Sequence, residues 1–248
     1  MTDVAYELVY YRFFSAGDVA RLVLDYAGAN YKNVFVNRES MDAIKADQRF
    51  GKVPRLTIKA ADGSEKHLWE SRAIQEYIAD VFNLFPSSDP FDRADSIAFV
   101  CSLYEIFDMF QAIWLYPSLD ARRMFWTRLK NERVLQTLRH HEKHLAINSA
   151  SGMFYHGTRY TTCTSVVVGM RAHFPQIHLP DLVLYALWLR LETMFGQGSI
   201  VNEVNTPQIS KLVQACDAGK PGEWAKERRD FGAAKWNMEE IKWELDYS

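Results

Sequence analysis

The sequence has few cysteines. Cys101, Cys163 and Cys216 are widely separated and odd in number, which fits neither a disulfide framework nor a zinc module built on paired cysteines. We therefore expect a reducing compartment, the cytoplasm, and no bound metal.

Long apolar runs and a basic excess are also lacking. The N-terminus, MTDVAYELVYYR, has no basic segment followed by a long apolar stretch, so it indicates no secretory signal. The apolar runs are too short and too interrupted to span a bilayer, so we expect no membrane partner. The 29 Lys and Arg residues balance 31 Asp and Glu residues to a formal charge of −2, which disfavours nucleic acid as a partner.

The length of 248 residues, 48% of them hydrophobic, is typical of one or two globular domains. The first part predicts the order β-α-β-α-β-β-α. Its predicted strands are residues 5–11 and 31–36 and a hairpin that turns at Asp62-Gly63, and its predicted helices begin at the Ser15 cap, at residue 40 and at Ser71.

The composition changes after Phe82, where FNLFPSSDPF is typical of a linker. Beyond it the pattern is mostly helical, although TTCTSVVVG, inside the uninterpreted segment 149–178, resembles a strand. Helices are predicted at residues 93–116, 120–146, 181–195 and 206–217, and the 181–195 helix is apolar nearly all round. The predicted domains are residues 1–83 and 93–248, with a linker at 84–92.

Four motifs occur in a characteristic order. In YELVYYR…ARLVLDYAG, Arg21 stands eleven residues after Tyr10, and FGKVPRL and WESRAI follow, whereas LPDLVLYALW in the helical part matches in outline only. Together they resemble the glutathione transferases, of the tyrosine type and nearest the sigma class. The resemblance implies an α/β plus all-α fold: a thioredoxin-like domain with a mixed four-stranded sheet, then an all-helical domain.

The resemblance also implies a glutathione site. Pro54 stands in the place of the family's cis-proline, so the N–H and C=O of Val53 are expected to pair with the tripeptide backbone like an added strand. Glu70 is expected to attract the ammonium group, while Ser71 and the helix N-terminus hold the γ-glutamyl carboxylate. Lys45 corresponds to a lysine that contacts the glycyl carboxylate, and Lys52 is assigned to the same site.

Thiol activation is assigned to Tyr10, whose hydroxyl is expected to donate a hydrogen bond to the glutathione thiolate. Two alternatives remain: Tyr11, expected on the opposite face of the strand, and Ser15, because other classes of the family use a serine near the first helix. Arg21 is expected to form a structural salt bridge. The sequence departs from the family at two positions: it has Ala16 where the family has a basic residue, and Met41 where the family has an aromatic residue.

The helical domain is expected to bind the acceptor. The resemblance implies a homodimer in which Glu105 reaches the partner subunit's glutathione. The segment FGAAKWNMEEIKWELDYS is interpreted either as a lid over the acceptor pocket or as a helix packed on the surface. The expected pocket residues are Phe14, Tyr104, Phe107 and Gln111.

Two polar motifs of the helical part are assigned structural roles. Asp181 is expected to cap the central helix, although His178 stands where the family usually has Ser or Thr. His140, His141 and His144 lie in HHEKH, which is not a zinc motif, and we expect a solvated helix end there.

The resemblance implies transfer of the glutathione thiolate to an electrophilic, largely apolar acceptor, as in detoxification. A glutathione-dependent isomerase, a biosynthetic enzyme of the same fold and a non-catalytic binding protein remain alternatives. A thiol–disulfide oxidoreductase is disfavoured because no Cys lies near the end of the first strand and no Cys-x-x-Cys occurs.

Overall fold

The chain forms two compact units in the computed structural model, which describes residues 4–12, 15–148, 153–157, 177–228, 234–237 and 239–245. One unit comprises Met1–Ala79 together with Asp217–Ser248, and the other comprises Asp80–Cys216. This division differs from the domains predicted from sequence, because the last part of the chain groups with the N-terminal unit.

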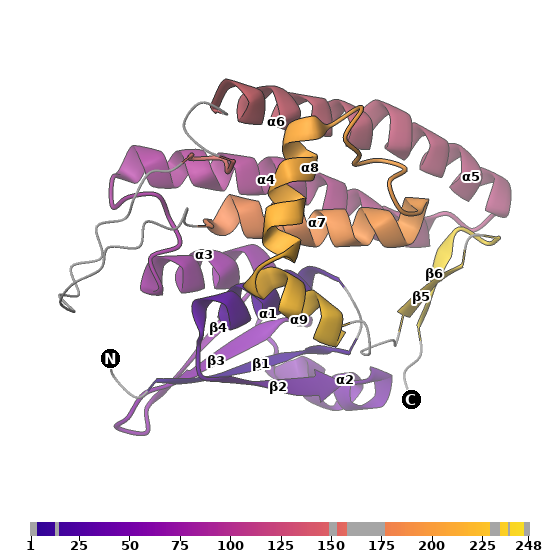
Figure 1. The fold of residues 1–248 in the computed structure, drawn as a ribbon. Helices are drawn as coiled ribbons and strands as arrows, with labels where there is room; N and C mark the ends of the chain where they lie inside the picture. The colour runs from indigo at the N-terminus through magenta and orange to yellow at the C-terminus, as the bar shows by residue number, and fades with distance from the viewer. Residues whose placement is uncertain are drawn as a thin grey trace, which may run out of the picture. The chain divides into compact units, whose positions relative to one another are not determined.

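A four-stranded mixed sheet forms the centre of the first unit (Figure 1). Its order is β2-β1-β3-β4, with β1 parallel to β2 and antiparallel to β3, and β4 antiparallel to β3. The predicted strands and hairpin are confirmed. The strand bounds are β1 Ala5–Tyr11, β2 Tyr31–Val36, β3 Arg55–Lys59 and β4 Glu65–Trp69.

Helix α1 is the crossover between the parallel strands β1 and β2, a connection that a short turn cannot make. The helical spacing of Val19, Leu22, Val23 and Tyr26 predicts that they share one buried face. The first three are fully buried, whereas Tyr26 is half-buried, and the helix ends at the left-handed Gly28. The helices of this unit are α1 Ala16–Ala27, α2 Arg38–Ile44 with a 3₁₀ turn at Lys45–Asp47, α3 Ser71–Val81, whose last residues belong to the second unit, and α9 Lys220–Arg228.

The described residues of the second unit are mainly helical, as predicted. Helix α7 is buried along most of its length, which explains why its sequence is apolar nearly all round. The helices are α4 Pro90–Ala112 with a 3₁₀ turn at Ile113–Leu115, α5 Leu119–Arg128, a π-helical segment at Leu129–Val134, α6 Leu135–Asn148, α7 Leu179–Phe195 and α8 Pro207–Asp217. Of the uninterpreted segment 149–178, only residues 153–157, 177 and 178 are described.

The C-terminal segment differs from the helix considered for it. Strands β5 (Ala234–Asn237) and β6 (Lys242–Leu245) form an antiparallel hairpin. The turn is organised by Asn237, whose side-chain oxygen accepts the N–H groups of Glu239 and Glu240 at 2.9 and 3.0 Å. Asparagine side chains stabilise turns in this way.

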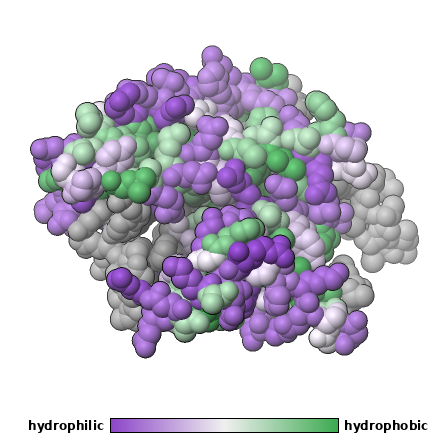
Figure 2. All heavy atoms as spheres, turned by 180° about the vertical axis from the view of Figure 1, so that it is seen from behind, coloured by the Kyte–Doolittle hydropathy of each residue, from purple (hydrophilic) through white to green (hydrophobic). Residues whose placement is uncertain are grey.

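Hydrophilic residues predominate on the face drawn in Figure 2, with hydrophobic residues scattered among them. In the part of the chain that the structure describes, no helix is long and apolar enough to cross a membrane.

Candidate functional site

Strand register brings the predicted site segments to one end of the sheet. Val9 of β1 lies opposite Arg55 of β3, and Arg55 lies opposite Trp69 of β4. Tyr10 follows Val9, Pro54 precedes Arg55, and Glu70 follows Trp69. The three segments therefore meet at the same end of the sheet, although they are far apart in the sequence.

The ring of Tyr10 is packed tightly against the start of α1. Tyr10 is 6% exposed, and a Cβ atom placed on Gly17 would lie only 2.2 Å from its Cδ1 atom. The Arg21 guanidinium carbon lies 5.5 Å from the Tyr10 ring centroid. Glycine at position 17 therefore permits the close approach that places the Tyr10 ring.

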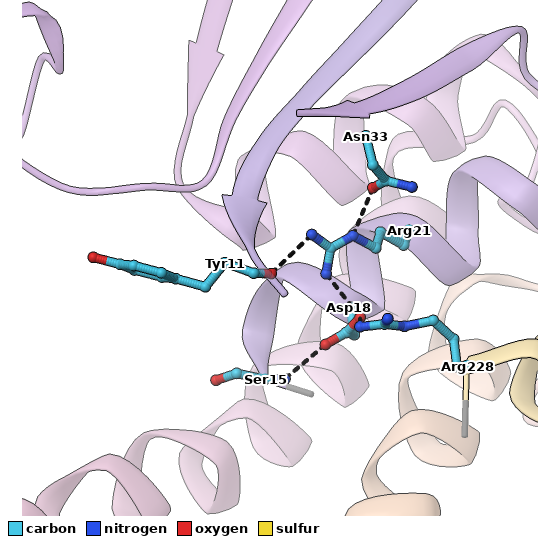
Figure 3. Close-up of polar contacts among 6 residues, drawn as sticks. All are labelled: Tyr11, Ser15, Asp18, Arg21, Asn33 and Arg228. Carbon is cyan, nitrogen blue, oxygen red and sulfur yellow. Dashed lines mark hydrogen bonds and ion pairs between the residues drawn. The ribbon is translucent and has the colours of Figure 1, made fainter. Parts of the chain in front are cut away.

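A buried polar network contacts the end of β1 (Figure 3). Arg21 donates from Nε to Asn33 Oδ1 at 2.7 Å and from one terminal nitrogen to the Tyr11 carbonyl at 3.0 Å. Its other terminal nitrogen pairs with Asp18 Oδ1 at 2.9 Å, and both side chains are buried. Asp18 Oδ2 accepts the N–H of Ser15 at 2.8 Å. Arg21 thus has the structural salt bridge that the sequence analysis predicted, and we call these contacts the Asp18 network.

Arg228, the last residue of α9, also belongs to the Asp18 network, and sequence reasoning missed it. Its terminal nitrogen donates to the same Asp18 oxygen that Arg21 contacts, across 210 residues of chain. The Arg228 side chain is buried, and burial lowers its pKa, with Asp18 opposing that shift. A basic residue at the end of a short helix gives no sequence signal for so distant a partner.

Ser15 and Tyr11, the two alternatives for thiol activation, differ in how their side chains are placed relative to the Asp18 network. Ser15 is almost fully buried and is the N-cap residue of α1. The Tyr11 ring points away from the Asp18 network in Figure 3, and its carbonyl accepts a hydrogen bond from Arg21. Which hydroxyl serves the thiol stays a prediction.

The backbone at Val53 is available for a ligand. The Val53–Pro54 peptide is cis, as the family resemblance implied, and Pro54 is buried. Val53 lies beyond the paired residues of β3, and neither its N–H nor its C=O has a backbone partner among the described residues. This edge can therefore pair with an added extended peptide.

Opposite charges flank this edge at the start of α3. Lys52 Nζ lies 2.9 Å from a Glu70 carboxylate oxygen, and the two side chains are 63% and 48% exposed. Glu70 adopts a φ of 71°, and its carbonyl accepts the N–H of Ile74. Ser71, which is mostly buried, is the first residue of α3. The site thus offers a cation, an anion and a helix N-terminus within a short span.

Gln48 is another residue that the sequence reasoning missed. Its buried side chain accepts the indole N–H of Trp69 at 3.3 Å and donates to the Ile44 carbonyl at 3.2 Å. It therefore ties the segment that carries Lys45 and Lys52 to the end of β4. Lys45 itself is exposed.

The acceptor residues predicted in the helical unit occupy two environments. Tyr104 and Phe107 are buried, with ring centroids 5.3 Å apart, whereas Glu105 and Gln111 are exposed. Phe14 lies outside the described residues. Their roles in binding an acceptor or a partner subunit stay predictions.

The prediction that HHEKH is a solvated helix end is wrong for His141. His141 is 4% exposed, and its ring nitrogens lie 2.5 Å from the Tyr155 hydroxyl oxygen and 3.1 Å from Ser102 Oγ. Burial is the main cause that lowers its pKa to about 4, so the ring is neutral at pH 7. His140 is exposed. The described residues contain no cluster of three or more His, Cys, Asp or Glu residues that could hold a metal ion.

Asp181 caps α7 as predicted. Its carboxylate accepts the His178 N–H at 2.8 Å and also the Tyr155 N–H at 3.0 Å. Burial raises the pKa of Asp181 to about 7, and these two hydrogen bonds oppose the shift. Asp181 therefore ties the segment around Tyr155 to the start of the central helix.

Comparisons with known proteins place the N-terminal part by sequence. Residues 6–80 match the family model of the glutathione S-transferase N-terminal domain. The probable glutathione S-transferase 7 of Caenorhabditis elegans is 35% identical over 81 residues, which are 33% of this chain and 37% of that protein. The chain thus matches little more than a third of the length of this curated relative.

Solved structures resemble this chain in fold over most of its length. A sigma-class glutathione S-transferase of Fasciola hepatica matches with a TM-score of 0.70 and 18% identity over 91% of this chain and 97% of that one. Prostaglandin synthase D of Nilaparvata lugens matches with a TM-score of 0.70 and 17% identity over 90% of this chain and 98% of that one. The fold class predicted from sequence is confirmed.

Proposed function

We propose that this chain, which belongs to the glutathione S-transferase superfamily through its N-terminal domain, binds glutathione and transfers its thiolate to an electrophilic, largely apolar acceptor. The observation that carries the proposal is the common end of the sheet at which Tyr10, Val53 and Glu70 meet. A hydroxyl, an open backbone edge and a charged helix start there match the thiol, backbone and termini of the tripeptide.

The termini of glutathione define the roles of the charged residues. Its backbone pairs with Val53, its γ-glutamyl carboxylate accepts from Ser71 at the start of α3, and its ammonium group faces Glu70. Lys45 and Lys52 attract the glycyl carboxylate. The Lys52–Glu70 ion pair is exposed and contributes at most about 1 kcal/mol, so a charged ligand displaces it at little cost.

The reaction needs the thiolate rather than the thiol. A thiol with a pKa of about 8.5 is only about 3% ionised at pH 7. A hydrogen bond donated by the Tyr10 hydroxyl favours the charged form, and lowering the thiol pKa by about two units requires about 2.7 kcal/mol of differential stabilisation. The nucleophile belongs to glutathione, so the protein needs to supply only a donor and the positioning.

The proposal includes a cytoplasmic homodimer in which Glu105 approaches the partner's glutathione and Tyr104, Phe107 and Gln111 contact the acceptor. A glutathione-dependent isomerase is the second candidate. The fold likeness to a prostaglandin synthase motivates it, and both candidates use the same thiolate. Assays with a generic electrophile and with an isomerisable substrate separate the two.

The decisive experiment compares Tyr10→Phe with the wild-type chain and with Tyr11→Phe as its matched control. Removing the Tyr10 hydroxyl should return the thiol pKa toward its solution value and lower kcat/KM at about pH 6.5 by roughly 50-fold. The affinity for glutathione, measured by calorimetry, should change little. Full activity in Tyr10→Phe would refute the assignment and favour Ser15 or Tyr11, and a wild-type chain that binds no glutathione would refute the function.

A further inference from the structure

We propose that Arg228 is a positioning residue of the thiol site, acting through Asp18 and Arg21 on the end of β1 that carries Tyr10. This inference rests on the proposed function. Its basis is the buried contact that brings α9 to the N-terminal end of α1 (Figure 3).

One carboxylate serves two guanidinium groups in this contact. Asp18 Oδ1 accepts from both Arg21 and Arg228, and all three side chains are buried. Arg228 therefore adds a positive charge beside the Asp18–Arg21 pair. Tyr31 on β2 also interacts with Arg228. Burial raises the pKa of Tyr31 above its ordinary value of 10, so its hydroxyl stays uncharged at pH 7.

The Asp18 network holds the last residue of β1 and the first residue before α1. Arg21 donates to the carbonyl of Tyr11, the neighbour of Tyr10, and Asp18 accepts the backbone N–H of Ser15. The Arg21 guanidinium also lies 5.5 Å from the Tyr10 ring centroid. A change at Arg228 is therefore transmitted to the Tyr10 hydroxyl through one shared carboxylate.

The sign of the effect follows from the charges. Without Arg228, the buried region around Asp18 and Arg21 loses one positive charge. In a buried region, where the effective dielectric constant is lower than in water, this loss disfavours a negative charge on the bound sulfur. Neutral substitutions at position 228 should therefore raise the pKa of the glutathione thiol in the complex.

The experiment uses the full chain with glutathione and a generic electrophile. Arg228→Met removes the charge and the hydrogen bond, Arg228→Gln removes the charge but keeps an N–H donor for Asp18, and Arg228→Lys keeps the charge. Lys226→Met is the matched control, because it removes a positive charge from an exposed position of the same helix. The readouts are the ultraviolet absorbance of the bound thiolate and the pH profile of kcat/KM.

We expect both neutral variants to raise the thiol pKa by about half a unit to one unit, which lowers kcat/KM roughly two- to sixfold at about pH 6.5. At about pH 9, where the thiol is ionised in every variant, kcat/KM should return to the wild-type value. Arg228→Lys and Lys226→Met should keep the wild-type profile. If Arg228→Met does not fold, Arg228→Gln carries the test.

Two results overturn the inference without touching the proposed function. One is a wild-type thiol pKa in a folded neutral variant whose parent lowers that pKa. The other is a loss of activity that is equal at all pH values, because that is the signature of a smaller folded fraction. A wild-type chain that leaves the thiol pKa at its solution value instead refutes the proposed function itself.

Discussion

Gly17→Ala tests whether the Tyr10 ring is placed by its contact with α1. The new Cβ atom would lie 2.2, 2.4 and 2.6 Å from three carbon atoms of the ring. Carbon atoms pack best at about 3.5–4.0 Å, so the ring has to move by more than about 1 Å. The Tyr10 hydroxyl moves with it.

The expected loss has two components. Overpacking of a buried site lowers the free energy of unfolding by about 1–3 kcal/mol. The higher helix propensity of alanine raises it by up to about 1 kcal/mol. Urea unfolding should therefore show a net destabilisation of about 1–2 kcal/mol. Because a displacement of about 1 Å of a reacting group can cost about 100-fold in rate, kcat/KM should fall by one to two orders of magnitude.

A double-mutant cycle with Tyr10→Ala separates the contact from the helix effect. Once the ring is gone, Gly17→Ala should be neutral or stabilise the chain by up to about 1 kcal/mol. The reasoning is refuted if Gly17→Ala leaves both stability and activity at wild-type values, or if it costs the same in the Tyr10→Ala background.

Two further predictions concern charge. Folding lowers the pKa of His141 from its ordinary value of 6.5 to about 4, so the unfolded chain binds more protons between these values and His141 lowers stability as the pH falls through them. His141→Gln should flatten this part of the profile by about 1.4 kcal/mol per pH unit in urea titrations, and an unchanged slope would contradict the low pKa. Lys52→Met should weaken glutathione binding several-fold in calorimetry while the melting temperature stays within experimental error, since its ion pair with Glu70 is exposed. Equal affinities would remove Lys52 from the site.

Sequence periodicity was sufficient for most elements of the fold. The stripe of Val19, Leu22 and Val23 predicted the buried face of α1, and the β-formers of residues 5–11 predicted β1 with its observed bounds. The motifs also predicted the cis peptide before Pro54 by resemblance. Such patterns are local, so a single chain segment is enough to read them.

The contacts that complete the candidate site were not accessible in the same way. The hydrogen bond between Gln48 and Trp69 and the pairing of Arg228 with Asp18 join residues whose proximity depends on strand register and on helix packing. His141 was misjudged for the same reason, because the Tyr155 that covers it comes from another segment. The C-terminal hairpin depends on the pairing of β5 with β6, which the residues of this segment do not reveal by themselves.

The first unit is formed by two separate chain segments, which affects its folding during synthesis and the exchange of domains. During translation, the four-stranded sheet and α1 are synthesised before α9. Asp18 can therefore pair with Arg228 only after the second unit has been synthesised. A chimera that joins residues up to Ala79 to a foreign helical domain inherits the sheet without this guanidinium. Domain exchange in this protein therefore has to carry α9 along with the N-terminal segment.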